Sequence, residues 1–159
     1  MGVGCLYMVK TRLVSAINNG VVIDHIVAGQ ALKIMRLLHV VNNQQRVTLG
    51  LNLTSKRLKL KDLIKIENRT LSLEEINQVG VFSPSATINC IKNFAVCEKT
   101  RCSLPELIRG VLFCPNPNCI SRLTGKSHFS LEELHKEISF YCIYCEKQFN
   151  HDQFDTINL

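Results

Sequence analysis

The sequence has no hydrophobic run long enough to cross a membrane. Its most apolar stretch, residues 20–41, is interrupted by Asp24, His25, Lys33 and Arg36, whereas a spanning helix needs about 20 consecutive apolar residues. Residues 1–9 are too short for the apolar core of a signal peptide. Low-complexity tracts and internal repeats are also missing. We therefore expect a globular protein that resides in the cytoplasm.

Sequence motifs of catalysis are missing as well. The chain has no glycine-rich phosphate loop, no H-E-x-x-H zinc motif and no H-x-E motif of the zinc deaminases. Asp24 and His25 are adjacent, but neighbouring residues on a strand point to opposite faces. We interpret them as a partly exposed loop pair or as a pair that orients a ligand. These observations argue against an enzyme that acts alone.

Acidic residues are fewer than basic ones, so the formal net charge is +6 and the pI is near 9.0. This excess is compatible with an anionic partner such as a nucleic acid, a nucleotide or an acidic protein. The basic residues are scattered except in residues 56–61, where they alternate with leucine. That alternation is typical of the solvated face of a strand rather than of a phosphate-binding tract.

Cysteine, in contrast, is abundant. Four of the eight cysteines form two close pairs, Cys114 with Cys119 and Cys142 with Cys145, in the spacing C-x4-C-x22-C-x2-C. Two short chelating loops predict one structural zinc ion per chain, because four thiolates leave no coordination position open for water. The alternatives are two disulfides, which need an exported chain, or four ordinary buried thiols. The other cysteines show no pairing pattern and are interpreted as free thiols: Cys5, Cys90, Cys97 and Cys102.

Hydrophobic periodicity predicts an α+β unit in the first two thirds of the chain. Strands are predicted over residues 13–17, 21–23, 47–53, 63–67, 86–91 and 94–98, with a single apolar face on the third. A helix of about three turns is predicted over residues 27–38. A second helix begins with the capping box of Ser72 and Glu75 and ends at Gly80. This order is that of a ferredoxin-like fold, an antiparallel sheet with two helices on one face.

The composition predicts a second, smaller domain. We divide the chain into a tail (residues 1–10), a ferredoxin-like domain (11–100), a linker (101–106) and a four-cysteine domain (107–159). The last domain is too small to be stable on apolar burial alone, so the metal would supply folding free energy. We expect a zinc-ribbon-like β domain with both cysteine pairs on hairpin turns and a helical turn over residues 132–137.

Five motifs, in order along the chain, resemble the regulatory chain of aspartate carbamoyltransferase. They are VIDHI at residues 22–26, GLNL at 50–53, KDLIKIEN at 61–68, CPNPNCI at 114–120 and CIYCE at 142–146. The resemblance implies a non-catalytic subunit of a pyrimidine-pathway transcarbamoylase. It implies inhibition by CTP with UTP, activation by ATP, pairing of regulatory chains as dimers, and a zinc domain that docks on the catalytic chain and links catalytic trimers.

The resemblance also assigns residues to a nucleotide site. These are Val14, Ser15, Ala16, Ile17, Asp24, His25, Lys65, Asn89, Ile91, Phe94 and Lys99. Lys65 and Lys99 would hold phosphates and Asp24 would accept hydrogen bonds from ribose hydroxyls, while the backbone of residues 14–17 would read the base. Ser15 stands where the family has a glutamate, and Phe94 stands where it has a tyrosine. Both departures bear on the relative strength of the nucleotide effects.

Two asparagines of the first cysteine loop, Asn116 and Asn118, are candidates for contact with the catalytic chain. The alternative function is that of a zinc-ribbon protein that binds nucleic acid through its basic surface. The four-cysteine region lacks aromatic residues interleaved with a basic tract, and its glutamates dilute the positive charge. The sequence therefore favours the regulatory chain.

Overall fold

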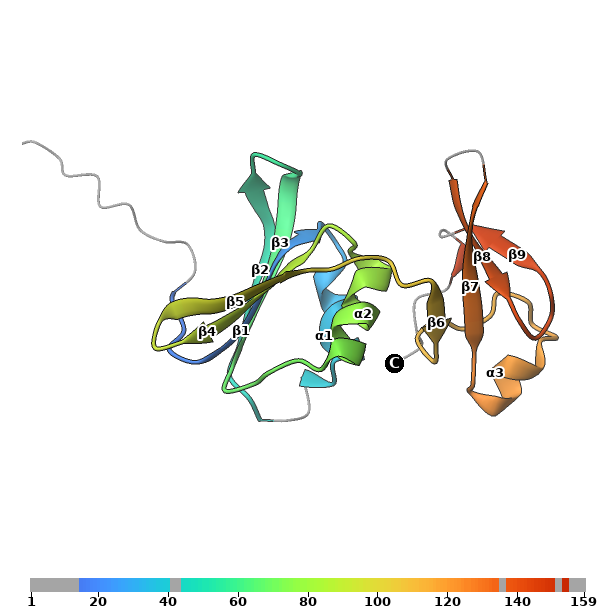
Figure 1. Ribbon diagram of the computed structural model, residues 1–159, viewed down its shortest axis with the longest axis horizontal. Helices are drawn as coiled ribbons and strands as arrows, with labels where there is room; N and C mark the ends of the chain where they lie inside the picture. The colour runs from blue at the N-terminus through green and yellow to red at the C-terminus, as the bar shows by residue number, and fades with distance from the viewer. Residues whose placement is uncertain (1–14, 41–43, 135–136, 151–152, 155–159) are drawn as a thin grey trace, which may run out of the picture.

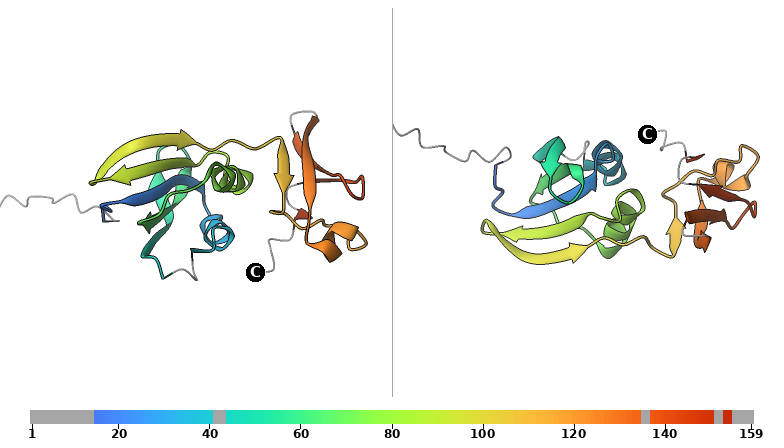
Figure 2. Two further views of the ribbon diagram at one scale, coloured as in Figure 1. Left: turned by 60° about the horizontal axis from the view of Figure 1, so that its bottom comes forward. Right: turned by 90° about the horizontal axis from the view of Figure 1, so that it is seen from above.

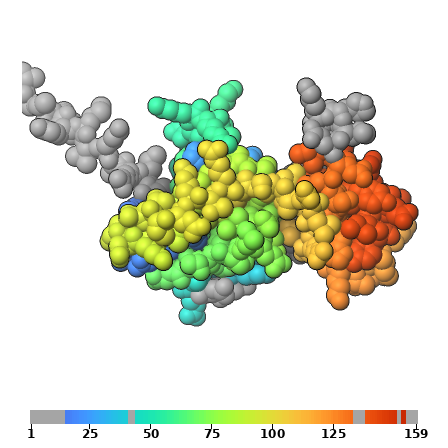
Figure 3. All heavy atoms as spheres, viewed as in Figure 1, coloured from blue at the N-terminus to red at the C-terminus, as the bar shows by residue number. Residues whose placement is uncertain are grey.

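A computed structural model describes residues 15–40, 44–134, 137–150 and 153–154. Its elements are β1 (Gly20–Val27), α1 (Ala31–Leu37), β2 (Val47–Ser55), β3 (Lys59–Glu67), α2 (Leu73–Phe82), β4 (Thr87–Lys92), β5 (Ala95–Arg101), β6 (Leu107–Arg109), α3 (Ile120–Thr124), β7 (His128–Leu134), β8 (Glu137–Cys142) and β9 (Gln148–Asn150). The strands form two sheets (Figure 1). In the space-filling view of Figure 3, the parts of the chain that contain the two sheets form two adjoining units. Within these ranges, no helix is long and apolar enough to span a membrane.

The first sheet has the order β2-β3-β1-β4-β5, and its neighbouring strands are antiparallel. The chain order β1-α1-β2-β3-α2-β4 combined with this strand order is the ferredoxin-like plan, to which β5 adds an edge strand. Figure 2 shows α1 and α2 on the same face of the sheet. The predicted α+β fold class is therefore confirmed.

The core lies between this sheet and the two helices. Ile23 of β1 pairs with Ile64 of β3 and with Ile88 of β4, and none of the three is more than 5% exposed. Ile34 of α1 and Val79 of α2 belong to the same buried cluster. Because directly paired residues share a face of a sheet, residues at the intervening positions face away from the helices.

Two bulges lie opposite adjacent residues of β3, the first opposite Leu63 and the second opposite Asp62. One interrupts β1 between Ile23 and Ile26, and the other interrupts β2 between Gly50 and Leu53. The second bulge ends the alternation of β2, so Leu51 is 44% exposed. The prediction of one continuous apolar face over residues 47–53 is therefore wrong beyond Gly50, because an inserted residue reverses which side chains face the core.

The N-terminal elements differ from the prediction in extent. Residues 15–17, the described part of the first predicted strand, are not in a strand. Helix α1 begins at Ala31 and has 7 residues, because Val27 is still part of β1. Ala31, Ile34 and Leu38 are nevertheless buried, as the apolar stripe predicts. The prediction of about three helical turns from residue 27 is wrong, because Val27 ends β1 and a turn separates it from α1.

Helix α2 begins as predicted and ends later. The Ser72 side chain accepts from the Glu75 N–H, and the Glu75 carboxylate accepts from the Ser72 N–H, which completes the capping box. Gly80 does not end the helix, which continues to Phe82. A Cβ at Gly80 would lie 2.1 Å from the Ser103 carbonyl oxygen. This glycine therefore allows the segment after β5 to pass directly over the helix.

The second sheet, β6-β7-β8-β9, is antiparallel, and its core is a cluster of aromatic rings. Phe154 makes edge contacts with Phe129, Phe140 and Phe149 at centroid separations of 5.1, 4.9 and 6.1 Å. The helical turn predicted over residues 132–137 is wrong for the described part of that segment, since β7 runs to Leu134 and β8 begins at Glu137. Residues 135–136 lie outside the described residues.

Candidate functional site

The four paired cysteines converge at one end of the second sheet. Cys114 and Cys119 precede α3, whereas Cys142 ends β8 and Cys145 lies in the turn before β9. Their sulfur atoms all lie within 4.8 Å of one another. The second pair is on a hairpin turn, as predicted. The first is not, because α3 follows it directly.

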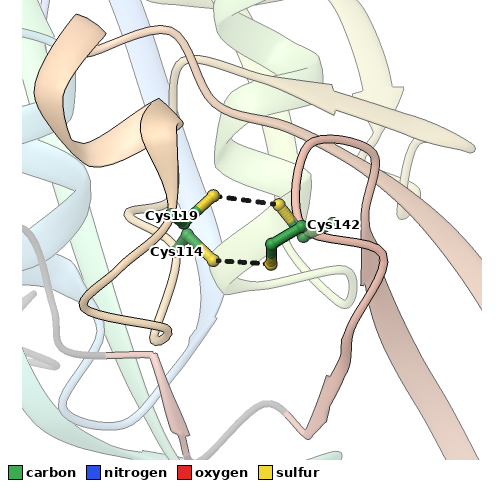
Figure 4. Close-up of side chains that lie close together, drawn as sticks. Cys114, Cys119 and Cys142 are labelled. Carbon is green, nitrogen blue, oxygen red and sulfur yellow. Dashed lines mark hydrogen bonds between the residues drawn. The ribbon is translucent and has the colours of Figure 1, made fainter.

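The separations between sulfurs exclude disulfides in this arrangement. Cys114 Sγ lies 3.6 Å from Cys145 Sγ, and Cys119 Sγ lies 3.8 Å from Cys142 Sγ, compared with about 2.05 Å in a disulfide. Figure 4 shows the Cys119 and Cys142 side chains pointing toward one another across the two loops. All described cysteines are free thiols. The cluster thus has the form of a metal site.

Neighbouring residues hold the two loops in place. Arg122 Nη1 donates to the Cys114 carbonyl oxygen at 2.7 Å. The Ser121 hydroxyl lies 3.1 Å from Cys119 Sγ. In the second loop the Glu146 N–H donates to the Cys142 carbonyl oxygen at 2.9 Å. These supporting residues were missed in the sequence analysis, and only their closeness to a cysteine could have indicated them.

The environment acts differently on the cysteine thiols. Burial raises the pKa of Cys114 and of Cys142. Burial also opposes ionisation of Cys119, but hydrogen bonds from the Ser121 hydroxyl and N–H lower the pKa of Cys119 to about 7. Several buried thiolates side by side require a compensating cation, and a bound metal ion provides that charge.

The residues assigned to a nucleotide site lie largely on the helix-free face of the first sheet. Val22 of β1 pairs with Lys65 of β3 and with Asn89 of β4, and Asn89 pairs with Lys99 of β5. These four residues form one row across the sheet, on the face opposite the helices. Lys99 is exposed and Lys65 is half-buried. The sheet register thus brings two lysines, distant in the sequence, to one surface.

The remaining residues of the assignment surround this row. Ile91 is buried at the end of β4, and Phe94, at the tip of the β4–β5 hairpin, is 67% exposed. Ser15 and Ala16 are exposed and Ile17 is buried. The Lys65 ammonium donates to the Ser15 carbonyl oxygen. Val14 lies outside the described residues.

The bulge in β1 brings Asp24 and His25 together. His25 has a φ of 58°, and its Nδ1 lies 3.3 Å from Asp24 Oδ2. The expectation that these two side chains point to opposite faces is wrong, because the bulge breaks the alternation of the strand. Lys61 Nζ also pairs with Asp24 Oδ1 at 2.7 Å. Lys61 was missed by the assignment, although its place four residues before Lys65 puts it on the same face of β3.

The surface around the cysteine loops is apolar. Large hydrophobic side chains more than a third exposed in this region are Phe113, Ile120, Leu123, Ile143 and Tyr144. Asn118 is exposed, whereas Asn116 is half-buried and its Oδ1 accepts from the Asn118 N–H at 3.2 Å. Asn116 thus shapes the first cysteine loop. The apolar side chains were not among the predicted contact residues, because exposure cannot be read from the sequence.

A ferredoxin-like sheet with a cationic open face, followed by a small four-cysteine β unit, defines a binding protein with a metal-binding module. Family models match both parts. Residues 12–103 match the aspartate carbamoyltransferase regulatory chain, allosteric domain. Residues 106–155 match the aspartate carbamoyltransferase regulatory chain, metal binding domain.

Curated relatives agree with the family models. The chain is 48% identical over 140 residues to the aspartate carbamoyltransferase regulatory chain of Aeromonas salmonicida, covering 87% of this chain and 91% of the relative. It is 45% identical over 146 residues to that of Chromobacterium violaceum, covering 91% and 96%. It is 46% identical over 140 residues to that of Salmonella arizonae, covering 87% and 92%.

The chain therefore belongs to the aspartate carbamoyltransferase regulatory chain family. It is a regulatory and non-catalytic chain with an allosteric domain and a metal-binding domain. The resemblance found in the sequence is thus confirmed, as is the expectation of a chain that does not itself catalyse a reaction. The alternative of a nucleic-acid-binding zinc-ribbon protein is not supported by these relatives.

Proposed function

We propose that this chain binds nucleoside triphosphates on the helix-free face of its first sheet and transmits their binding to a catalytic chain of aspartate carbamoyltransferase. The effectors would be CTP, with UTP, as inhibitors and ATP as activator in pyrimidine biosynthesis. The enzyme would act in the cytoplasm. The observation that supports this proposal best is the row of Lys65, Val22, Asn89 and Lys99 across β3, β1, β4 and β5.

The charge of this face suits a triphosphate. Lys61 and Lys65 lie on one side of Val22, and Lys99 and Arg101 lie on the other, all on the helix-free face by their register. A nucleoside triphosphate carries about four negative charges, so ammonium groups from separate strands can hold its phosphates. Asp24 is kept in place by Lys61 and would accept hydrogen bonds from ribose hydroxyls.

Base recognition would involve the residues beside the row. The backbone of residues 14–17 would pair with the edge of the base, which distinguishes a cytosine from an adenine without side-chain chemistry. His25, Ile91 and Phe94 would complete the pocket. Phe94 presents an exposed ring at the hairpin tip, and a flat ring can pack against a base or ribose.

The metal is proposed to be one structural zinc ion, held by Cys114, Cys119, Cys142 and Cys145. A tetrahedral zinc site with Zn–S bonds of about 2.3 Å places its sulfurs about 3.8 Å apart. The separations of 3.6 Å between Cys114 and Cys145 and of 3.8 Å between Cys119 and Cys142 fit that geometry. An all-thiolate set favours zinc over the harder cations. It also leaves no open position, so the metal would stabilise the fold and take no part in catalysis.

The metal-binding domain is proposed to dock on the catalytic chain. Its exposed apolar residues, Phe113, Ile120, Leu123, Ile143 and Tyr144, frame the cysteine loops, and a patch of this kind is typical of a protein interface. Asn116 and Asn118 would contact the same partner. Regulatory chains would pair as homodimers and thereby link two catalytic trimers.

The path between the two domains is short. Lys99 lies two residues before the end of β5, and the chain then crosses α2, where Ser103 lies directly over Gly80. We place the domain boundaries at residues 100 and 107, with the tail before residue 11. A nucleotide that holds Lys99 would shift the packing of this segment on α2. The shift would favour one quaternary state of the assembly, with CTP and ATP favouring opposite states.

Calorimetric titration of the chain with CTP and ATP tests the nucleotide site. Lys65→Gln or Lys99→Gln should weaken binding about tenfold or more, since a hydrogen bond to a charged group contributes about 1.5–3 kcal/mol. Lys92→Gln is the matched control, because Lys92 lies on the same hairpin but at a position of the opposite face. Equal losses in all three variants would contradict a specific site on this face.

Assembly with catalytic trimers tests the docking proposal. The zinc-loaded chain should join two trimers into one larger complex, detectable by light scattering, and removal of zinc should prevent this. If a chain stripped of zinc assembled as well as the loaded chain, the structural role of the metal would be wrong. Tight and steeply salt-dependent binding to DNA or RNA, without any response to CTP, would favour the nucleic-acid-binding alternative.

A further inference from the structure

Two cysteines outside the metal cluster meet on the β4–β5 hairpin. Cys90 of β4 pairs with Glu98 of β5, and the next residue, Ile91, pairs with Val96. Cys97 is thus the extra residue of a bulge, so Cys97 and Glu98 both lie opposite Cys90. The bulge is what places two cysteines, seven positions apart in the sequence, on adjacent strands at the same level.

The two side chains are in contact range. The Cys97 thiol donates to the Cys90 carbonyl oxygen at 3.3 Å, so its sulfur already lies over the neighbouring strand. A hydrogen bond with the Cys97 side chain raises the pKa of the Cys90 thiol, and burial adds to this effect. Both residues are free thiols. The two thiols are therefore neighbours across the hairpin.

A soluble reagent can reach this pair. β5 is an edge strand of its sheet, and all of its residues except Thr100 are exposed. Cys97 is exposed and Cys90 is half-buried. Cys102, which follows β5 directly, is 6% exposed, and burial raises its pKa to about 11. The hairpin therefore presents one accessible thiol with a second thiol beside it to resolve an oxidised intermediate.

We propose that Cys90 and Cys97 form a reversible redox site, in which a low-molecular-weight disulfide oxidises the two thiols to an intramolecular disulfide. The Cys97 thiolate attacks one sulfur of the reagent, whose S–S bond breaks and releases one thiolate. The Cys90 thiol loses its proton and its sulfur attacks Cys97, which releases the second half of the reagent as a thiolate. The protein loses two electrons and two protons, and the reagent becomes two thiols.

The disulfide would fix the bulge next to several functional positions. Asn89 and Ile91 flank Cys90, and Lys99 lies two residues beyond Cys97. Oxidation would thus stiffen the strand that leads into the segment over α2. Formation of the disulfide itself depends only on the geometry of the hairpin, so the proposal stands independently of nucleotide binding and of the identity of the metal.

Peptide mapping of the metal-loaded chain after exposure to oxidised glutathione tests the proposal. Trypsin cleaves after Lys92 and Lys99, so Cys90 and Cys97 fall in separate peptides, residues 70–92 and 93–99. The expected product is a cross-linked pair of these peptides, lighter than their sum by two hydrogens and separated by dithiothreitol. The number of thiols titratable in denaturant with chelator should fall from eight to six, since two of the eight are consumed.

Single variants provide the controls. Cys97→Ser and Cys90→Ser should each abolish the cross-link, whereas Cys102→Ser should leave it unchanged. A melting curve for each variant verifies that it folds. The proposal is overturned if glutathione stays attached to Cys97 without any cross-link, if the two lost thiols belong to the metal cluster, or if the disulfide joins two chains. Equal thiol loss in wild type and Cys97→Ser would also overturn it.

Discussion

At the scale of single residues, Asp62 of β3 connects the bulge of β2 with the start of α1. Its buried carboxylate accepts from the N–H groups of Gly29 at 2.8 Å, Asn52 at 2.9 Å and Ala31 at 3.4 Å. These donors belong to the loop before α1, to the bulge of β2 and to the first residue of α1. One side chain therefore accepts from an N–H group in the bulge of β2 and from two N–H groups at the start of α1.

Replacement of Asp62 should lower the stability of the fold. Asp62→Ala leaves one buried and two partly buried N–H groups without their acceptor. Each buried group left unpaired costs about 1–3 kcal/mol, so we expect a loss of about 3 kcal/mol in the free energy of unfolding. Asp62→Asn keeps one acceptor oxygen and should cost less. Urea denaturation measures both variants. A cost below about 1 kcal/mol for alanine would show that water replaces the carboxylate.

The sign of the stability change on replacing Gly80 tells whether the segment at Ser103 is held against α2. In an exposed helix, Gly→Ala stabilises by about 1 kcal/mol. Here a Cβ would lie 2.1 Å from the Ser103 carbonyl oxygen, so we expect Gly80→Ala to destabilise by about 1–3 kcal/mol. Asn77→Ala, at an exposed position of the same helix, is the control and should be neutral or stabilising. Stabilisation by Gly80→Ala in urea denaturation would mean that the segment moves away freely.

At the scale of elements, helix α2 depends on its first turn. Besides the two hydrogen bonds of the capping box, Arg69 Nη2 lies 2.6 Å from Glu75 Oε1. Burial opposes ionisation of Glu75, but the bonds from Ser72 and Arg69 outweigh it and lower the pKa of Glu75 from its ordinary value of 4.5. The charged form of Glu75 is therefore favoured in the folded state.

This lowered pKa makes the contribution of Glu75 dependent on pH. It should be fully present above about pH 4.5, the ordinary value, and should be lost as the pH falls through the lower folded-state pKa. Wild type should thus be more stable than Glu75→Gln at pH 7, and the difference should shrink in acid. Ser72→Ala, which removes the cap itself, should cost about 1 kcal/mol at neutral pH. A constant difference for Glu75→Gln between pH 7 and pH 3 would contradict the role of its charge.

At the scale of the whole molecule, two sheets are joined by a short segment and contribute to one buried cluster. The first sheet has a core built from strands and two helices. The second sheet has a small aromatic cluster and the four cysteines. A core of that size is marginal without a cross-link or a metal, so we expect the second sheet to depend on a metal ion held by the four cysteines.

Removal of the metal should therefore unfold the second sheet first. A strong chelator, or Cys142→Ser, should reduce the metal content from about one ion per chain to a small fraction of it. The second sheet should then lose its amide protection while β1, β3 and β4 keep theirs, as hydrogen exchange can measure. Metal release should become easier as the pH falls, because protons compete for thiolates. Cys102→Ser, outside the cluster, should retain the metal, and uniform loss of protection in both sheets would contradict independent stability.

The sequence by itself determined the elements whose signals are local. The capping box of Ser72 and Glu75 involves residues within one turn of helix, and the cysteine pairs are close in the chain, so spacing alone identified them. The strand and helix order was also sufficient for the ferredoxin-like plan. The nucleotide residues came from the resemblance, since no local pattern indicates that Lys65 and Lys99 share a surface.

Only the tertiary structure decided the features that depend on register and close approach. The bulges in β1, β2 and β5 turned Asp24 toward His25, exposed Leu51 and brought Cys97 to Cys90. Gly80 reads as a helix end in the sequence, yet the chain uses it to let another segment pass. An inserted residue changes the facing of every side chain after it, and the position of an insertion is set by contacts between distant segments, which periodicity along the chain does not record.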